Sequence, residues 1–323
     1  GLLKPTIDLF PAAKNVCLID SVGSQANRIE PLFMDEAYRT LVPQVTVAAG
    51  EKTVNLLEAG HRAGDALVRC SALQEELQKA FKAAIKGDAE PLAKVAPTSL
   101  VFGVWDSRDT QAKMPRLLSS TIRAFDVRKL TRSAQFVPAM DYVGSGQLDA
   151  PADKAAADAY SERGFVHVPA TGTHGGVIAT GGVRRDATFS LAALRLLAVR
   201  EGGTLSVDRT RALRRYILGL GLVAFTASRN EYLRQGCMLV PDIDRPREMT
   251  LVNGDGNRLA AGLTHEQALA YAKVAAAAFG VGPDRAVTFE KVRAQADIKG
   301  EGKEKKQKKS GKAAKDESPK TEG

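Results

Sequence analysis

Apolar and polar positions follow one another in short blocks, and these blocks predict a mixture of strands and helices. Continuous apolar or β-branched runs predict strands over 16–20, 41–48, 100–105, 133–143, 165–168, 175–183 and 237–240. Apolar positions at helical spacing predict helices over 21–30, 65–86, 113–125, 186–200, 209–228 and 265–279. The two element types mix without strict alternation, which favours an α+β fold.

End signals sharpen some of these elements. Thr264 and Gln267 have the spacing of a capping box, and Gly280 follows as a stop signal. Pro31 ends the first helix, and Asp208 is placed to cap the helix over 209–228.

The segment 101–132 couples an apolar run to a basic amphipathic pattern. On a helix of about 100° per residue, Lys113, Arg116 and Arg123 share one arc with Ser120. The opposite arc holds Leu117, Leu118, Ile122 and Phe125. Seven Lys or Arg against three Asp give a net charge of +4 in 32 residues. We expect the apolar face to pack on a sheet, while the cationic face, with Arg108 and Arg128, contacts an extended polyanion. A solvated helix face is the alternative.

A second candidate segment follows the first predicted strand directly. In SVGSQANRIE, the short polar side chains of Ser24, Gln25 and Asn27 stand beside Arg28. Such side chains hydrogen-bond phosphates and sugar hydroxyls with little steric demand. The alternative is an ordinary helix start capped by Ser21 or Ser24.

The third candidate is the glycine-rich run GTHGGVIATGG, which contains His174 and precedes Arg184 and Arg185. Backbone amides in such a run can approach a phosphate chain closely. The run matches neither the P-loop nor the dinucleotide-binding fingerprint. A twisted hairpin with bulges is the structural alternative.

The net charge of the chain limits the kind of partner that it can bind. The chain of 323 residues carries a net charge of +9 and a pI near 9.4, which favours an anionic partner. Residues 299–323 contribute nine Lys and five acids and are expected to be a disordered tail. Residues 1–298 are expected to form one body, with a surface insertion at about 144–163.

Neither catalysis nor a cofactor is expected. The four histidines lack a metal-ligand spacing, the acids Asp106, Asp109 and Asp126 are better explained as partners of arginines, and no nucleophile motif is present. Three isolated cysteines fit a reducing cytoplasm. The longest apolar run, 216–227, is too short to span a bilayer. Trp105 is expected in the core, and an aromatic content of 6% argues against binding dominated by base stacking.

Three segments together closely resemble one protein family. They are CLIDSVGSQANRIEPLF, FGVWDSRDTQAKMPRLLSSTIRAFDVRKLTRSAQFVPAMDYV and GGVIATGGVRRDATFSLAALRLL. The family is the CRISPR-associated RAMP family that forms the backbone subunit of type I-U (I-G) Cascade. The resemblance runs from about Val16 to Pro241, with a weaker match up to Gly280.

This resemblance implies a modified RRM-like (ferredoxin-like) palm with insertions that include a thumb hairpin. It implies that identical subunits stack helically along one CRISPR RNA, hold its ribose–phosphate chain and display it to target DNA in antiviral defence. Other Cascade subunits and a recruited helicase–nuclease are the further partners, and cleavage belongs to the latter. The chain lacks the aromatic strand of ordinary RRM domains, which argues against base-stacking recognition.

Two alternatives remain open. One is a type III-like backbone subunit that cuts target RNA with a metal, in which Asp141 or Asp149 would act. The other is a monomeric adaptor that binds structured RNA.

Overall fold

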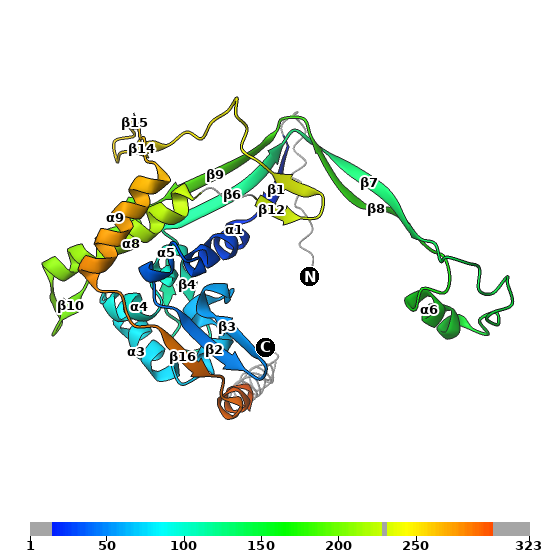
Figure 1. Ribbon diagram of the computed structural model, residues 1–323, viewed down its shortest axis with the longest axis horizontal. Coiled ribbons are helices and arrows are strands. Elements are labelled where there is room, and N and C mark those ends of the chain that lie inside the picture. Colours follow the sequence, from blue (N-terminus) through cyan, green and yellow to red (C-terminus); the bar gives the residue numbers. More distant parts are fainter. Residues whose placement is uncertain (1–14, 228–230, 300–323) are drawn as a thin grey trace, which may run out of the picture. The chain divides into compact units, whose positions relative to one another are not determined.

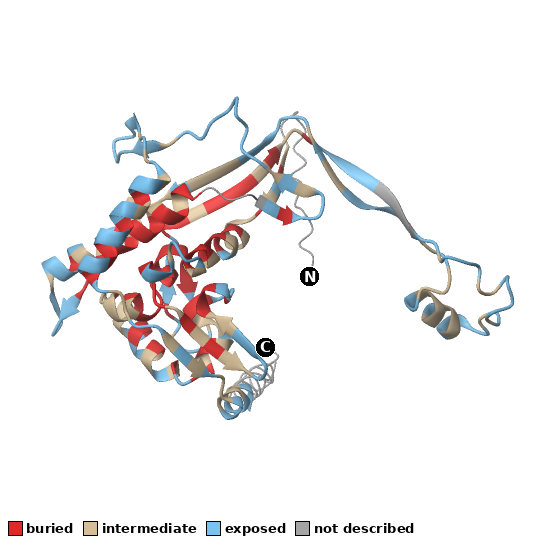
Figure 2. Ribbon diagram, viewed as in Figure 1, coloured by how far each residue is buried: buried red, intermediate tan, exposed pale blue. Residues whose placement is uncertain are grey.

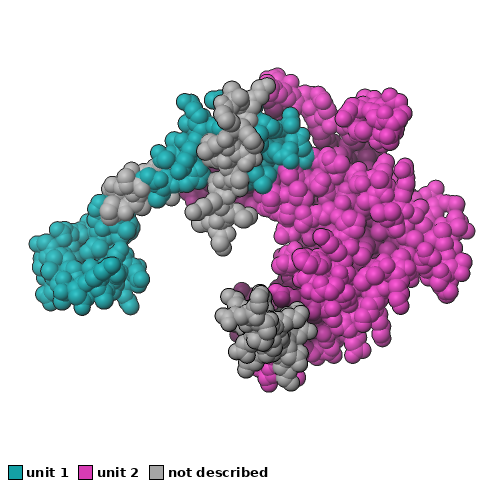
Figure 3. Space-filling model, turned by 180° about the vertical axis from the view of Figure 1, so that it is seen from behind, with its two compact units in different colours: residues 1–19, 122–186 teal, residues 20–121, 187–323 magenta. Residues whose placement is uncertain are grey.

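The computed structural model describes residues 15–227 and 231–299 and divides into two compact units (Figure 3). Unit 1 comprises residues 1–19 and 122–186, and unit 2 comprises residues 20–121 and 187–323. The predicted C-terminal tail, apart from Lys299, lies outside the described residues.

Unit 2 contains most of the helices (Figure 1). Its α-helices are α1 (Val22–Ile29), α2 (Ala66–Arg69), α3 (Gln74–Ile85), α4 (Glu90–Val95), α5 (Thr98–Phe102), α7 (Leu191–Leu194), α8 (Val207–Thr226) and α9 (His265–Phe279). Its 3-10 helices are η1 (Glu30–Met34), η2 (Arg39–Leu41), η3 (Leu56–Glu58) and η4 (Arg62–Gly64).

The strands of unit 2 form several small sheets. They are β2 (Val45–Ala49), β3 (Lys52–Asn55), β4 (Val104–Trp105), β5 (Lys113–Met114), β10 (Arg200–Glu201), β11 (Thr204–Leu205), β12 (Glu231–Arg234), β13 (Cys237–Leu239), β14 (Thr250–Val252), β15 (Arg258–Ala260) and β16 (Arg285–Thr288). In the sheet β16-β2-β3, β2 pairs parallel with β16 and antiparallel with β3. The pairs β4-β5, β10-β11, β12-β13 and β14-β15 are separate two-stranded sheets.

The core of unit 2 is built around α8, one side of which is buried (Figure 2). Tyr216 is fully buried there; its ring stacks on Phe279 of α9 at 4.7 Å, and its hydroxyl donates to the Leu41 carbonyl at 2.8 Å. A Cβ on Gly219 would lie 2.8 Å from the Ala272 Cα, so glycine is needed for the close approach of α8 and α9.

Unit 1 is organised around strands and one long hairpin. Strands β1 (Val16–Asp20), β6 (Leu118–Phe125) and β9 (Val183–Phe189) form a sheet in the order β1-β6-β9, and the unit boundary falls within each of these strands. Strands β7 (Val127–Phe136) and β8 (Val168–Ala179) form the antiparallel hairpin. The segment that joins β7 to β8 carries α6 (Lys154–Glu162), at the end of the hairpin (Figure 1).

The structure confirms the α+β class and several local predictions. Strand β1 has the predicted bounds, and α1 begins at the predicted place with Ser21 as its cap, accepting from the Ser24 amide at 3.3 Å. Helix α9 has both hydrogen bonds of the capping box between Thr264 and Gln267 and ends at Gly280.

The predicted basic helix over 113–125 is wrong, because this segment forms β5 and β6. In β6 the side chains of Leu118, Ser120, Ile122 and Ala124 are all buried, which is the period of two that a strand requires. Pro115 interrupts the segment, and the β-branched Thr121 and Ile122 favour a strand. An apolar spacing that suits a helix thus also suits a buried strand.

Other boundaries also shift. Residues 98–102 form α5 rather than a strand, and the predicted helix over 65–86 is broken between α2 and α3. Strand β9 and the short α7 occupy most of the predicted helix over 186–200, and the residue at the cap position of α8 is Ser206 rather than Asp208. Within the described ranges, no helix is both long and apolar enough to cross a membrane.

Candidate nucleic-acid interface

In unit 2, the first turn of α1 lies beside the side chain of Arg116. A terminal guanidinium nitrogen of Arg116 is 3.7 Å from where a Cβ on Gly23 would stand. Arg116 is exposed, but its Nε donates to the Phe102 carbonyl at 3.0 Å, which fixes the direction of the side chain. Gly103 makes this possible: its φ is +78°, and a Cβ there would lie 2.6 Å from the Arg116 Cγ. The site therefore presents a fixed cation next to a helix start.

Partial burial and the nearby Arg62 lower the pKa of Arg116 from its ordinary value. An arginine nevertheless keeps its charge near neutral pH, because its ordinary pKa lies above about 12.

Gln25 has a different position from the one expected. It is buried; its Nε2 donates to Asp20 at 2.7 Å, and its Oε1 accepts from the Ser120 hydroxyl at 2.9 Å. These bonds join β1, α1 and β6 within unit 2. A direct contact with a ligand does not fit Gln25, which instead positions its neighbours.

Two other predicted residues of α1 also have partners in unit 2. The Arg28 Nε lies 3.3 Å from Asp20, and a terminal nitrogen donates to the Leu233 carbonyl at 2.9 Å. Asn27 is exposed and accepts from Arg62 at 3.1 Å, and Ser24 is half-buried.

A buried ion pair lies behind this surface, and the sequence pattern did not single it out. The Nε of Arg62 is 2.5 Å from the Glu30 carboxylate, and both side chains are buried. Arg62 also donates to the Gly103 carbonyl at 3.3 Å, so it contacts the glycine beside which Arg116 passes. Arg62 has a φ of +53°, a strained conformation for a residue with a side chain. No periodicity marks such a residue in advance.

Burial raises the pKa of Glu30 to about 7, although the charge of Arg62 acts to lower it. Between the ordinary pKa of 4.5 and the raised pKa of about 7, the Glu30 carboxyl is protonated in the folded state and ionised in the unfolded state. Its contribution to stability is therefore present below the ordinary pKa and is lost as the pH rises through 7.

The hairpin β4-β5 carries an exposed tryptophan, which corrects the prediction that Trp105 belongs to the core. The residue is 56% exposed. Trp105 pairs with Lys113 across the strands, and the Lys113 Nζ lies 5.6 Å from the centre of the Trp105 ring. Lys113 and Arg108 are exposed, and Arg108 lies in the loop that joins the two strands.

In unit 1, two predicted arginines share one carboxylate. Arg123 of β6 lies 3.6 Å from Asp186, and the Arg184 Nε lies 2.9 Å from it. The guanidinium of Arg184 also stands over the Phe125 ring at 4.9 Å. Asp186 offsets only one of the two positive charges. Arg185 is half-buried on the same strand.

The hairpin β7-β8 holds the remaining predicted residues. Arg128 faces Ile178 across the hairpin, and His174 faces Thr131; all four side chains are exposed. The glycine-rich run thus forms the main part of β8, with register shifts along the hairpin. This is the arrangement of the structural alternative, a twisted hairpin with bulges.

The acids of the nuclease alternative lie in the segment that joins β7 to β8. Asp141 accepts from the Gly144 amide at 2.8 Å, and the backbone oxygen of Asp149 accepts from the Tyr160 hydroxyl at 3.1 Å. Across the described part of the chain, no three His, Cys, Asp or Glu side chains are grouped so that they could hold a metal ion.

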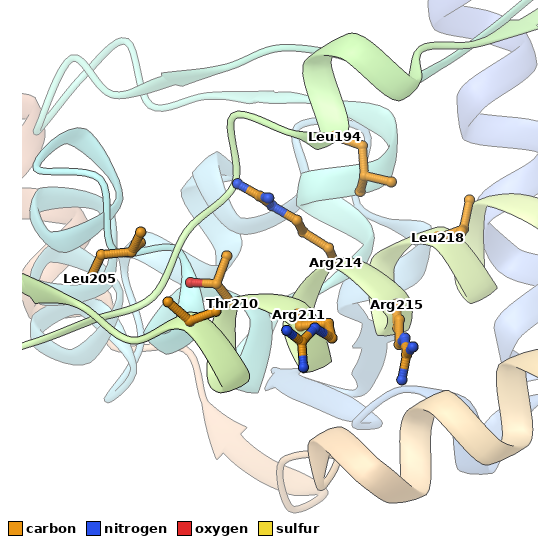
Figure 4. Close-up of a pocket in the computed structure, with 8 residues that line it drawn as sticks. Leu194, Leu205, Thr210, Arg211, Arg214, Arg215 and Leu218 are labelled. Carbon is orange, nitrogen blue, oxygen red and sulfur yellow. The ribbon is translucent and has the colours of Figure 1, made fainter.

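A groove elsewhere in unit 2 contains arginines that the sequence analysis did not select. It is lined by Leu194, Leu205, Val207, Thr210, Arg211, Arg214, Arg215 and Leu218 (Figure 4). Arg214 donates to the Leu197 carbonyl at 2.7 Å, and Arg211 pairs with Asp208 at 3.1 Å. No residue of the predicted interface lines this groove.

Residues 4–129 match the family model described as CRISPR-associated protein GSU0053 (Cas_GSU0053). The match ends within β7 and includes α1, the hairpin β4-β5 and β6. Over these residues, somewhat more than a third of the chain, the sequence is similar to a CRISPR-associated protein family. No curated protein matches the chain significantly.

The raised pKa of Glu30 predicts how stability depends on pH. As the pH rises from 4.5 to 7, the free energy of unfolding of the wild type should fall relative to that of the Glu30→Gln variant. Each pH unit should lower the wild-type value by about 1.4 kcal/mol, and the total fall over this range should be at most about 3 kcal/mol. Urea unfolding at several pH values measures it.

Glu51→Gln, which removes an exposed carboxylate, is the matched control and should keep the wild-type slope. Should Glu30→Gln not fold, the double variant Glu30→Met/Arg62→Met removes the pair as a whole. If the variants that lack the Glu30 carboxylate show the same pH dependence of stability as the wild type, this assignment is contradicted.

Proposed function

We propose that this chain is a CRISPR-associated protein that binds CRISPR RNA as the backbone subunit of a type I-U (I-G) Cascade. In this proposal the sheet β1-β6-β9 and α1 belong to an RRM-like (ferredoxin-like) palm, and the hairpin β7-β8 is the thumb. Several copies stack along one guide and present it to target DNA, together with other Cascade subunits and a recruited helicase–nuclease. The family match supports the CRISPR-associated role, and the closer assignment rests on the resemblance of the three sequence segments.

The main support for the proposal is that most of the predicted RNA-binding cations lie within the residues that match the family model. The matched residues contain six of the predicted cations: Arg28, Arg108, Lys113, Arg116, Arg123 and Arg128. Each of their side chains is exposed or half-buried. A cation with access to solvent can replace the counterions of a phosphate chain, whereas a buried one cannot.

The chemistry of these residues favours contacts to the RNA backbone over reading of base edges. Arginines present a planar fork of donors that matches phosphate oxygens. A subunit that accepts any guide sequence must rely on such contacts, because phosphates carry no sequence information. Modest affinity at each subunit suffices, because neighbours on one strand bind with avidity.

We also propose that the subunit does not cut nucleic acid. The Asp141 carboxylate accepts a backbone amide in a local turn, which gives this acid a structural role in the loop. The recruited nuclease supplies cleavage in this proposal.

Two guides with unrelated spacers should bind with affinities that agree within about threefold, because the contacts are to phosphates. The logarithm of the affinity should fall linearly with the logarithm of the salt concentration. Filter binding at several salt concentrations measures both.

A second experiment tests for cleavage. Complementary RNA, added to the complex and recovered after incubation with Mg²⁺, should remain full length. A large spacer-dependent difference at fixed salt, or cuts that Asp141→Ala or Asp149→Ala abolishes, would contradict the proposal.

The double variant Arg116→Ala/Arg123→Ala should weaken guide binding and shorten or abolish the assembly. The salt slope should become shallower by about 1.4, because two phosphate contacts to a single strand are lost at about 0.7 each. Arg211→Ala/Arg215→Ala removes the same charge from the groove of Figure 4 and is the matched control. Normal assembly of the first variant at physiological salt, with an unchanged melting temperature, would rule out this contact assignment.

A further inference from the structure

We propose that Trp105 and Lys113 form a stacking subsite for one nucleobase of a bound single strand. This inference rests on the proposed function and adds to it a contact to a base, which the aromatic content alone argued against.

The position of the Trp105 ring is the first observation. Tryptophan buries a large apolar surface when it packs inside a protein, yet Trp105 is 56% exposed. It is the single tryptophan of the chain. An exposed indole beside cations provides the stacking face and the phosphate attraction that single-strand binding sites combine.

The backbone that holds the ring is well fixed. The Asp106 amide donates to the Ala112 carbonyl at 2.9 Å, which extends the pairing of Trp105 with Lys113. The buried Asp106 carboxylate accepts from the Thr110 amide at 2.8 Å and from its hydroxyl at 2.6 Å. These bonds close the loop between β4 and β5. A loop backbone held in this way loses little conformational entropy when a base stacks on the ring.

The positive charge around the Trp105 ring favours a nucleotide as the ligand. The Lys113 Nζ lies 5.6 Å from the ring centre, Arg108 is exposed in the adjoining loop, and Arg116 follows β5. Three cations on one short segment suit a base with its phosphates better than an apolar protein side chain. Because every base has an aromatic face, such a subsite also tolerates any guide sequence.

The single tryptophan makes the test direct, because its emission reports on this position alone. Hexauridylate and hexaadenylate RNA should both quench the emission of the full chain in step with their binding, measured separately with labelled oligonucleotides. A hexamer of abasic sugar phosphates should bind more weakly and leave the emission unchanged. Trp105→Ala should weaken hexamer binding about tenfold, and Trp105→Phe should recover part of that loss.

Tyr271→Ala, a change at a partly exposed aromatic of α9, is the control and should bind like the wild type. The inference is overturned if bound hexamers leave the emission unchanged, or if the abasic hexamer quenches equally. It is also overturned if emission changes with protein concentration alone, since a second copy then covers the ring. When guide RNA binds and the emission does not respond, only the stacking subsite fails. When the wild type binds neither guide nor hexamer, the proposed function fails with it.

Discussion

The buried ion pair between Glu30 and Arg62 is the interaction on which the rest of the candidate site depends. Arg62 contacts η1 through Glu30, α1 through Asn27 and the end of α5 through the Gly103 carbonyl. Removing two charges from water is costly, and a buried pair is tolerated only when its geometry is good and further hydrogen bonds satisfy the remaining donors. The bonds to the Gly103 carbonyl and to Asn27 provide a partner for each terminal nitrogen of Arg62. The pair therefore fixes the relative positions of the segments that carry the exposed cations.

A second buried network supports the same surface. Gln25 connects Asp20 to Ser120, and Asp20 is also the partner of Arg28. Polar groups placed inside the fold thus orient the cations outside it. Residues of one short sequence motif therefore have different roles, since Gln25 is buried and supports the fold, whereas Asn27 is exposed.

The sequence predicted well where the signal is local. The Thr264–Gln267 capping box and the apolar run of β1 depend on neighbouring residues, and both elements form as expected. It failed at β6, because the segment from Leu118 to Phe125 satisfies helical spacing and strand alternation alike, and its place between β1 and β9 adds to the local preference of its β-branched residues for a strand. The burial of Gln25 and the Arg62–Glu30 pair arise from contacts between segments far apart in the sequence, and no local pattern encodes them.

The central claim is that identical copies bind along one guide through its backbone. The most direct test is the mass of the complex formed by the full chain on guide RNAs with spacers of two lengths, measured by light scattering or native mass spectrometry. The account predicts that the number of subunits rises in proportion to spacer length and does not depend on spacer sequence. One subunit for each RNA, whatever its length, would contradict the account and support the monomeric adaptor.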